Sequence, residues 1–464
     1  MQTEPAALSS RSVDQTAAGK AHRQVVPRRS HRIWSAPANR AEPVELLRAQ
    51  DEDRLDELVP IRWGRMSVSP FAFYRGSAAL MAADLATLPR TELTAQLCGD
   101  AHLSNFGLYA SPERALMFDV NDFDETHPGP FEWDVKRLAA SLAIAGRNNG
   151  LPDEAGRAAA RAAARSYRTH MTTYAAMREL DVWYSRVVAD DLLASVRSKK
   201  IAKPKVVNRA AATTARTLEK ARARTSAQAA TKLTELAAGR PRIVDQPPLI
   251  THPEGIDRTE MLRLFRQYTR TMSDERRLLM QRFEVVDVAH KVVGVGSVGT
   301  RCFIVLLMGH DNDDPLLLQV KEAGKSVLEP HLGASQFKHS GHRVVVGQRL
   351  IQAASDIFLG WMTGRPAGRH FYWRQLRDMK GSVEVERLGA AGLELYAEIC
   401  GWALARGHAR SGQRMAIAAY LGSGDAFDAA IADFAMSYAD QAERDFAELQ
   451  GLIKLGKVPV TTGV

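Results

Sequence analysis

The hydrophobic pattern changes along the chain, and it predicts helical segments on both sides of a sheet. From residue 43 to 88 apolar residues recur at helical spacing, and Ser69-Pro70 has the form of a helix start. From Asp134 to about Arg240 the chain is rich in Ala, the strongest helix former. Between residues 283 and 380, β-branched and Leu-rich runs are broken by Gly and Asp turns, which predicts a small antiparallel sheet. The pattern after residue 380 is mainly helical again.

Short apolar runs mark the individual strands. They span residues 93–97, 115–120, 285–295, 301–308, 316–320, 356–362 and 370–376. The first two runs each end in acidic residues, so we expect them to pair as a β-hairpin that delivers carboxylates to one cleft. Helices are expected over 71–88, 257–282 and 341–354, and a proline-rich loop over 241–253.

The composition is that of a globular protein with its own core. Of 464 residues, 45% are hydrophobic and 25% are charged. Cys98, Cys302 and Cys400 lie far apart without paired spacing, which argues against a disulfide framework or a zinc ribbon. No apolar run approaches the roughly 18 residues of a membrane span, and no secretory signal pattern is visible. We therefore expect a cytoplasmic protein with no transmembrane segment.

Positive charge is concentrated in two segments of a chain whose net charge is +9. Residues 1–40 are basic and poor in bulky apolar side chains, so we expect 1–42 to be a disordered tail whose deletion costs little stability. Residues 197–242 carry thirteen Lys and Arg against two acids. This second segment could make weak electrostatic contact with nucleic acid or another anionic surface, although a solvated helix face is the simpler explanation.

A candidate catalytic loop lies at residues 98–105, with the sequence CGDAHLSN. In phosphotransferases an Asp orients or accepts the proton of the attacking hydroxyl group. The chain then turns back, so that an Asn five residues later can reach a metal ion through its amide oxygen. Asp100 and Asn105 have this spacing. On its own the motif is also compatible with a polar surface turn.

Acidic residues follow the next predicted strand, in the segment FDVNDFDE at 118–125. Asp122 is followed by an aromatic residue at a strand end, where a carboxylate can hold Mg²⁺. Asp124 shares the strand face of Asp122 and is a candidate second ligand, whereas Asp119 lies on the opposite face. A calcium-binding EF-hand loop is excluded, because Phe123 and Asp124 occupy positions that need a ligand and a glycine.

A glycine-rich segment, GVGSVG at 294–299, precedes a predicted strand and not a helix. A dinucleotide-binding fold requires a helix directly after the glycines, so that interpretation fails. Glycines between two antiparallel strands can instead form a flap whose backbone amides lie over phosphates. Lys321 ends the following apolar strand, which is where kinases place the Lys that contacts the nucleotide phosphates. An ordinary glycine hairpin remains the structural alternative.

Together these motifs resemble a known superfamily. GDAHLSN is similar to the catalytic loop of aminoglycoside phosphotransferases and related members of the protein kinase-like superfamily, and residues 121–135 resemble their metal-binding segment. From about Arg62 to Tyr438 the chain also resembles an uncharacterised bacterial family, domain of unknown function 2252. The features of this second resemblance are Tyr74-Arg75-Gly76, 98–107, 121–126, 133–141, Gly347-Gln348-Arg349 and 405–412.

The resemblance to the phosphotransferases implies roles for individual residues. These roles are catalytic for Asp100 and His102; metal-binding for Asn105 and Asp122, with Asp124 beside them; nucleotide-binding for Gly294, Gly296, Gly299 and Lys321; and supporting for Asp134 and Glu329. Glu329 is the nearest acid that could pair with Lys321. The implied cofactors are ATP and Mg²⁺.

The motifs occur in inverted order, since the catalytic loop precedes the glycine-rich segment by about 190 residues. The resemblance therefore implies an α+β, kinase-like, two-lobed fold that is circularly permuted, which surface connections tolerate. Its expected segments are a basic tail (1–42), the catalytic-loop and metal-site part of a helical large lobe (43–196), a basic helical segment of that lobe (197–282), a small β-lobe with the glycines and Lys321 (283–380) and a C-terminal helical part of the large lobe (381–464).

The expected activity is ATP- and Mg²⁺-dependent phosphoryl transfer to an unidentified hydroxyl group on a small molecule or a protein. One alternative keeps the fold but changes the chemistry, to nucleotidyl transfer or to nucleotide binding without catalysis. A second alternative is a protein that binds nucleic acid or an anionic surface through residues 197–242. This segment has no interleaved aromatic residues, which argues against base stacking.

Overall fold

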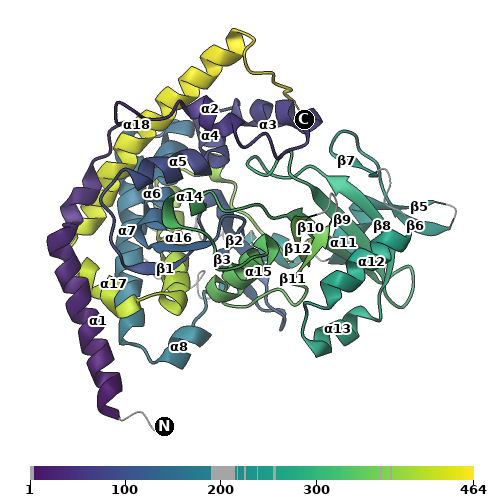
Figure 1. Ribbon diagram of the computed structural model, residues 1–464, viewed down its shortest axis with the longest axis horizontal. Helices are drawn as coiled ribbons and strands as arrows, with labels where there is room; N and C mark the ends of the chain where they lie inside the picture. Colours follow the sequence, from purple (N-terminus) through teal and green to yellow (C-terminus); the bar gives the residue numbers. More distant parts are fainter. Residues whose placement is uncertain are drawn as a thin grey trace.

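The structure is a computed structural model, and helices and strands segregate into two parts. It describes residues 5–189, 215–216, 218–223, 226–237, 239–253, 258–364, 368–376 and 379–463. Figure 1 shows a helical part on the left and a sheet with its own helices on the right, which makes the fold α+β. The strand β3 (Leu116–Val120) and the helix α15 (Ser340–Ile351) lie where the two parts meet.

The helical part contains the first and last segments of the chain. Its helices are α1 (Pro5–Val25), α2 (Pro43–Arg48), α3 (Val59–Met66), α4 (Pro70–Gly76), α5 (Ala78–Ala86), α6 (Glu132–Asn148), α7 (Asp153–Ala176), α8 (Glu179–Tyr184), α16 (Ala390–Ser411), α17 (Arg414–Leu421) and α18 (Ala426–Lys454). Two short antiparallel pairs accompany them: β1 (Thr94–Leu97) with β4 (His127–Pro130), and β2 (Phe106–Ala110) with β3 (Leu116–Val120).

Small residues allow the central helices to approach closely. Helix α6 is buried along most of its length, and α7 packs against both α6 and α16. At Gly401 a Cβ atom would lie 2.3 Å from the carbonyl oxygen of Ala163, and at Gly156 it would lie 3.1 Å from the Cα of Ala143. The Ala-rich composition that favours helix therefore also sets the packing distance between these helices.

The sheet part is built on six antiparallel strands in the order β11-β12-β10-β9-β8-β7. The strands are β7 (Ile250–Thr251), β8 (Glu284–Lys291), β9 (Cys302–Met308), β10 (Pro315–Glu322), β11 (Gly360–Gly364) and β12 (Arg369–Gln375). A separate pair, β5 (Thr234–Ala237) and β6 (Arg240–Ile243), lies beside them, and the helices of this part are α11 (Ser226–Leu233), α12 (Arg258–Thr269) and α13 (Asp274–Met280). After β10, the short helix α14 (Glu329–Leu332) packs against α5 and β4 of the helical part, and α15 (Ser340–Ile351) contacts both α16 and the strands β11 and β12.

Strand alternation gives this sheet two buried faces. Val305 and Leu307 of β9 belong to an apolar cluster with Tyr268 of α12. Their neighbours Ile304 and Leu306 point the other way, as successive strand residues do, and join a second cluster that includes α11. The predicted strands 285–295, 301–308 and 316–320 are thus the neighbouring strands β8, β9 and β10, and their antiparallel pairing is as expected.

Several predicted elements differ in detail from the structure. The predicted hairpin of strands 93–97 and 115–120 is wrong, because β1 pairs with β4 and β3 pairs with β2. The helix expected over 71–88 is two helices, α4 and α5, and that over 257–282 is α12 and α13. The proline-rich loop over 241–253 contains the end of β6 and the short strand β7.

The prediction of a disordered tail over residues 1–42 is wrong for its described part. Helix α1 packs along α17 at the left edge of Figure 1. Its Arg23 donates from Nε to the Tyr420 carbonyl at 2.9 Å, and Trp34 is only 4% exposed within the main core. The basic side chains bind helix-end carbonyl groups, which a compositional argument treats only as solvated charge.

Arg40 joins this N-terminal segment to two buried acids. Its guanidinium donates to Asp84 at 2.8 Å and to Asp445 at 2.7 Å, with all three side chains at most 10% exposed. Burial opposes the charge on Arg40, but hydrogen bonds to both carboxylates raise the pKa of Arg40 above its ordinary value. The segment is therefore part of the folded body.

Two further expectations concern the basic segment and membrane-spanning helices. Residues 197–214 of the basic segment 197–242 lie outside the described residues, and the described part of this segment includes α11, β5 and β6. Within the described ranges, none of the helices combines the length and the apolar character needed to cross a membrane.

We predict that deleting residues 1–40 destabilises the protein strongly, the reverse of the expectation from composition. Asp84 and Asp445 would stay buried without Arg40, and removing one partner of a buried ion pair costs about 3–5 kcal/mol. The single variant Arg40→Gln isolates this term in denaturant unfolding. Arg277→Gln, which removes an exposed pair with Asp274, is the control and should cost at most about 1 kcal/mol. Equal unfolding free energies for both variants would refute the docked N-terminal segment.

Neutral histidines cap the start of α15. The backbone N–H of His342 donates to Nδ1 of His339 at 3.3 Å, and that of Ser340 donates to Nδ1 of His370 at 3.0 Å. The two imidazoles stack at 3.9 Å. Burial, followed by the charges of His370 and His342, lowers the pKa of His339 to about 4, and burial lowers the pKa of His370.

These caps predict acid-sensitive stability. Unfolded histidines take up protons near pH 6.5, while His339 resists protonation down to about pH 4, so acid favours the unfolded chain across this window. His339→Asn keeps a capping acceptor but removes the titrating group. We expect its melting temperature to fall less than that of the wild type between pH 7.5 and 5. Parallel curves would show that the His339 cap does not control acid stability.

Candidate functional site

The β2–β3 hairpin closes the distance between the candidate catalytic loop and the acidic segment. Phe106 pairs with Val120, so the residues just outside the hairpin become neighbours. The backbone N–H of Asn121 donates to the carbonyl of Asn105 at 2.8 Å. Asn105 and Asp122 are thereby brought to the same end of the hairpin, although they are 17 positions apart in the sequence.

Asp100 lies in the loop after β1, where α6 supplies its ionic partner. Nε of Arg137 donates to Oδ1 of Asp100 at 2.8 Å, and Nε2 of His102 lies 3.7 Å from Oδ2. Burial raises the pKa of Asp100, and the charge of Arg137 opposes this shift. Burial, with the nearby positive charges of Arg75 and Arg137, holds the pKa of His102 well below its ordinary range. A neutral imidazole therefore stands beside Asp100.

Asp134, at the start of α6, holds the backbone of this loop. Its Oδ2 accepts from the N–H of Cys98 at 2.8 Å, and its Oδ1 accepts from the N–H of Gly99 at 3.1 Å. Nε2 of His408 lies 3.2 Å from Oδ2, and the Tyr167 hydroxyl is 2.9 Å from Nδ1 of the same imidazole. His408 is fully buried, so its contact with Asp134 lies inside the core.

Asn105 also stabilises the loop. Its side-chain Nδ2 donates to the carbonyl oxygen of Asp100 at 2.8 Å, which fixes the orientation of the amide. The amide oxygen is then the atom that can serve as a ligand. The Cys98 thiol is buried, and its Sγ lies 3.2 Å from Oδ2 of Asp134. Burial raises the pKa of this thiol well above its ordinary value.

The three acids at the end of β3 have different environments. Asp119 is fully buried and accepts from Nη2 of Arg406 at 2.6 Å. The side chains of Asp122 and Asp124 are 31% and 25% exposed. Burial alone would raise the pKa of Asp122, but the positive charges of Lys321 and Arg374 lower it to about 2. Asp119 thus serves the core, and the other two carboxylates face the site.

Lys321 reaches this acidic segment from the sheet part. Its Nζ forms an ion pair with Asp124 and lies 3.6 Å from Oδ1 of Asp122. The Tyr372 hydroxyl of β12 donates to Asp124 at 2.6 Å. Burial opposes the charge on Lys321, yet the carboxylates of Asp122 and Asp124 raise the pKa of Lys321 well above its ordinary value.

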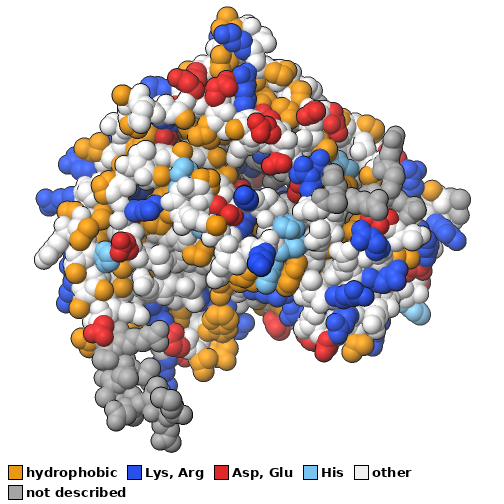
Figure 2. Space-filling view, in the orientation of Figure 1, with side chains coloured by type: hydrophobic (Ala, Val, Ile, Leu, Met, Phe, Trp, Pro, Cys, Tyr) orange, Lys and Arg blue, Asp and Glu red, His pale blue; other side chains and the backbone are white. Residues whose placement is uncertain are grey.

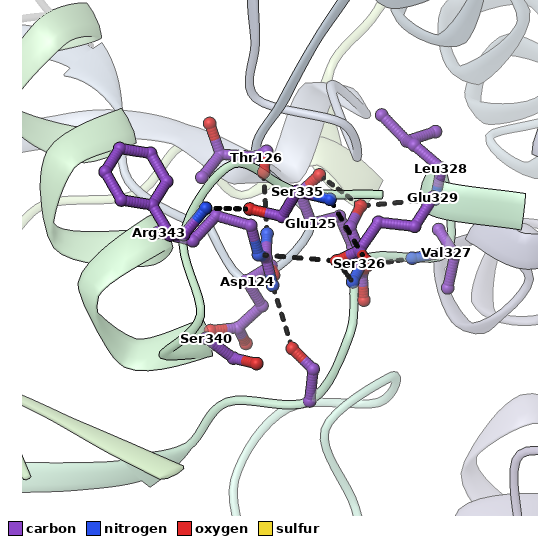
Figure 3. A network of polar contacts seen from close by, with 12 residues as sticks. Asp124, Glu125, Thr126, Ser326, Val327, Leu328, Glu329, Ser335, Ser340 and Arg343 are labelled. Carbon is purple, nitrogen blue, oxygen red and sulfur yellow. Dashed lines mark hydrogen bonds and ion pairs between the residues drawn. The ribbon is translucent and has the colours of Figure 1, made fainter. Parts of the chain in front are cut away.

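Glu329 does not pair with Lys321, so that expectation is wrong. Its Oε1 accepts from the backbone N–H of Ser326 at 3.0 Å and lies 3.9 Å from Nε of Arg343. Glu329 is the first residue of α14, and Figure 3 shows its carboxylate beside Ser326 and Ser335, whose backbone N–H groups donate to it, so it holds together the loop around α14. Its role is to support this loop and not to bind the lysine.

Arg343 of α15 connects the same loop to the acidic segment, as Figure 3 shows. Its guanidinium donates to the carbonyl oxygens of Thr126 at 2.6 Å, Asp124 at 2.8 Å and Gly324 at 3.0 Å. Glu125 adds a contact, since its Oε2 accepts from the N–H of Val327 at 2.7 Å. Burial raises the pKa of Glu125 to about 7. Sequence reasoning missed Arg343, although an arginine in an otherwise apolar helix face was a usable signal.

The glycine-rich segment joins β8 to β9 and reaches the helical part. Nη1 of Arg65 donates to the carbonyl of Gly294 at 2.6 Å, and the N–H of Leu55 donates to that of Gly299 at 2.8 Å. Gly299 has a φ of 88°, and a Cβ atom there would lie 3.0 Å from Cβ of Arg54. At Gly296 a Cβ atom would lie 3.4 Å from the carbonyl oxygen of Arg75. The segment is thus packed against α3 and α4.

The oxygen ligands available here suit a hard cation. Within the described ranges no group of three or more His, Cys, Asp or Glu side chains is arranged to hold a metal ion. Mg²⁺ does not require such a group, because it is commonly bound by one or two carboxylates together with water and substrate phosphates. Asp122, Asp124 and the Asn105 amide carry oxygen atoms of this chemical type.

Comparison with known proteins places the chain in a family. A search of curated proteins and a search of solved structures each found no match. A family model described as "Uncharacterized protein conserved in bacteria (DUF2252)" matches residues 54–451. This match covers the candidate catalytic loop, the acidic segment, the glycine-rich segment and Lys321, and it spans well over half of the sequence. The chain therefore belongs to this family of uncharacterised proteins conserved in bacteria.

Proposed function

We propose that the protein is a kinase-like phosphotransferase that uses ATP and Mg²⁺ and has a circularly permuted chain order. The observation that carries the proposal is the ion pairing of Lys321 with Asp124, with Asp122 at 3.6 Å. In kinases a strand Lys contacts the nucleotide phosphates and a strand-end Asp holds the metal, so the two must face each other across the nucleotide site.

The order of elements in the sheet part supports this proposal. The glycine-rich segment lies between β8 and β9, Lys321 lies on the next strand β10, and α15 and two further strands follow. A kinase small lobe has the same succession of glycine loop, Lys-bearing strand and helix. One difference is that α15 contains no Glu to pair with the lysine, and the acids of the β3 end take this place.

The order of elements in the helical part supports it independently. The loop with Asp100 and Asn105 is followed directly by the β2–β3 hairpin and then by Asp122. Kinases use a catalytic-loop Asp and Asn followed by a metal-binding Asp. This half precedes the sheet part in the sequence, which makes the proposed order a permutation.

The proposed mechanism relies on positioning and charge. Asp100, held by Arg137, would orient the acceptor hydroxyl and take its proton as the new phosphorus–oxygen bond forms and the bond to the nucleotide breaks. Asn105, Asp122 and Asp124 would hold Mg²⁺, which when bound neutralises phosphate charge. Lys321 would align the phosphates, and Asp134 would keep the catalytic loop in place.

Nucleotidyl transfer and nucleotide binding without catalysis use the same residues and remain the alternatives. Incubation with ATP labelled at the α- or the γ-phosphate separates them. Label transferred from the γ-phosphate supports phosphoryl transfer, and label from the α-phosphate supports nucleotidyl transfer. Retention of both labels in ATP across a broad panel of hydroxyl acceptors would favour binding alone.

We predict that Asp100→Asn lowers ATP turnover by roughly 10²–10⁴-fold, because a positioned acid/base group supplies about this factor. Nucleotide affinity should change little, since Asp100 is proposed to contact the acceptor and not the nucleotide. Turnover is measured with water or with any acceptor that the wild type uses. Asp153→Asn, at an exposed pair with Arg147 on α7, is the matched control. Wild-type turnover in Asp100→Asn would exclude the catalytic role.

We predict that Asp122→Asn and Asp119→Asn have separable effects. Asp122→Asn should weaken Mg²⁺-dependent ATP binding in calorimetry with little change in melting temperature, because its carboxylate is partly exposed at the site. Asp119→Asn should mainly lower the melting temperature, since it breaks a wholly buried pair with Arg406. The opposite assignment of the two effects would contradict the proposed metal site.

A further inference from the structure

Arg75, at the end of α4, is half-buried and has an unusual environment for a cation. Its Nε is buried and makes no hydrogen bond to any described residue. Its guanidinium lies 6.0 Å from the centre of the Phe71 ring, and the acids whose charge acts on it, Glu386 and Asp100, form neither a hydrogen bond nor an ion pair with it. Burial lowers the pKa of Arg75, but a guanidinium stays charged.

The fully buried cations near the site are compensated. Arg137 binds Asp100, Arg406 binds Asp119, and Lys321 binds Asp124. A cation held partly out of water without a partner is also unfavourable, and proteins normally pair it or satisfy its hydrogen bonds. The guanidinium of Arg75 is therefore suited to an anion that comes from outside the chain.

The position of Arg75 indicates where in the site such an anion would bind. Its carbonyl oxygen lies against Gly296, as the contact of 3.4 Å to a Cβ atom built there shows. The carbonyl oxygen of the preceding residue, Tyr74, accepts from Nη2 of Arg137 at 2.7 Å, and Nε of the same arginine donates to Asp100 at 2.8 Å. The charge of Arg75 also acts on both Asp100 and His102. Arg75 thus lies between the glycine-rich segment and the candidate catalytic acid. Figure 2 shows the face hollowed in the region between the helical part and the sheet.

His102 supplies a second buried polar atom without a partner, which also supports a ligand at this place. Nδ1 of His102 makes no hydrogen bond within the described part of the chain, while Nε2 lies 3.7 Å from Asp100. Because the imidazole is neutral, it can contribute one hydrogen bond to a ligand without adding charge. Arg75 and His102 together offer a planar cationic fork and a neutral polar group beside Asp100.

We propose that Arg75 binds a phosphate-class oxyanion at the acceptor side of the site, next to Asp100. The oxyanion is either the terminal phosphate of the nucleotide or a phosphate group on the acceptor. Arg recognises such groups through paired N–H donors, which a Lys point charge does not reproduce. This inference rests on the proposed function for the reaction in which the oxyanion takes part.

Calorimetry with inorganic phosphate, tripolyphosphate, Mg-ADP and Mg-ATP tests the proposal on wild type, Arg75→Gln and Arg75→Lys. Arg90→Gln is the control, because Arg90 is exposed and its Nη1 donates to the carbonyl oxygen of His331 in α14. Loss of charge-assisted hydrogen bonds should weaken the oxyanion probes by about 10- to 100-fold in Arg75→Gln. Arg75→Lys should be intermediate, and Arg90→Gln should match wild type.

The probes separate the two sources of the oxyanion. If Arg75 binds the terminal phosphate, Arg75→Gln weakens Mg-ATP but not Mg-ADP. If it binds a phosphate on the acceptor, both nucleotides bind normally, and inorganic phosphate added to the Mg-ADP complex binds more weakly. Binding of phosphate and tripolyphosphate but of neither nucleotide, with the Arg75 dependence retained, supports the inference while rejecting the proposed function.

Two results would overturn the inference. One is equal affinity of Arg75→Gln and wild type for all four probes, including the case in which wild type binds none of them. The other is a large fall in melting temperature in both Arg75 variants without ligand, which would make Arg75 a structural residue. Removing a half-buried charge that has no partner should instead leave the melting temperature unchanged or higher.

Discussion

The ion pairing of Lys321 with Asp122 and Asp124 is the interaction on which the candidate site depends. Lys321 and Asp124 are 197 residues apart in the sequence, and they come from a sheet and from a hairpin in the helical part. The Lys321 side chain is only 3% exposed, so its charge is favourable only when it meets an acid, because an isolated buried charge costs several kcal/mol. The pairing therefore specifies how the sheet part sits against the β2–β3 hairpin.

Arginines stabilise this arrangement from several elements. Arg137 of α6 positions Asp100, Arg406 of α16 pairs with Asp119, and Arg343 of α15 binds backbone carbonyls of the acidic segment. Each carboxylate or turn is thus held by a helix with its own hydrophobic packing, which gives the preorganisation that electrostatic catalysis needs. Arg75 is different, because its guanidinium has no such partner among the described residues.

Local spacing made part of the site predictable. Asp100, Asn105 and Asp122 were found from their positions at strand ends, and the glycines and Lys321 from a run of apolar strands. Their partners lie far away in the sequence and could not be found in this way. Glu329 was chosen for Lys321 because it is near in sequence, whereas Asp122 and Asp124 are near in space.

Packing also explains the errors in the fold. β4 has the sequence HPGP, which carries no strand pattern, so β1 was assigned the wrong partner. Helix α1 has little apolar character, and its contacts depend on basic side chains that bind helix-end carbonyls of α17.

Affinity labelling with an acyl phosphate of ATP is the most direct test of the central claim, that Lys321 and Asp122 face each other across a nucleotide site. Such a reagent carries a carbonyl group on its terminal phosphate, and a lysine amine beside the phosphates displaces ATP and forms an amide. The account predicts that peptide mass spectrometry finds the acyl group on Lys321 and that Mg-ATP protects it. Labelling confined to other lysines, or labelling of Lys321 that Mg-ATP does not reduce, would contradict the claim.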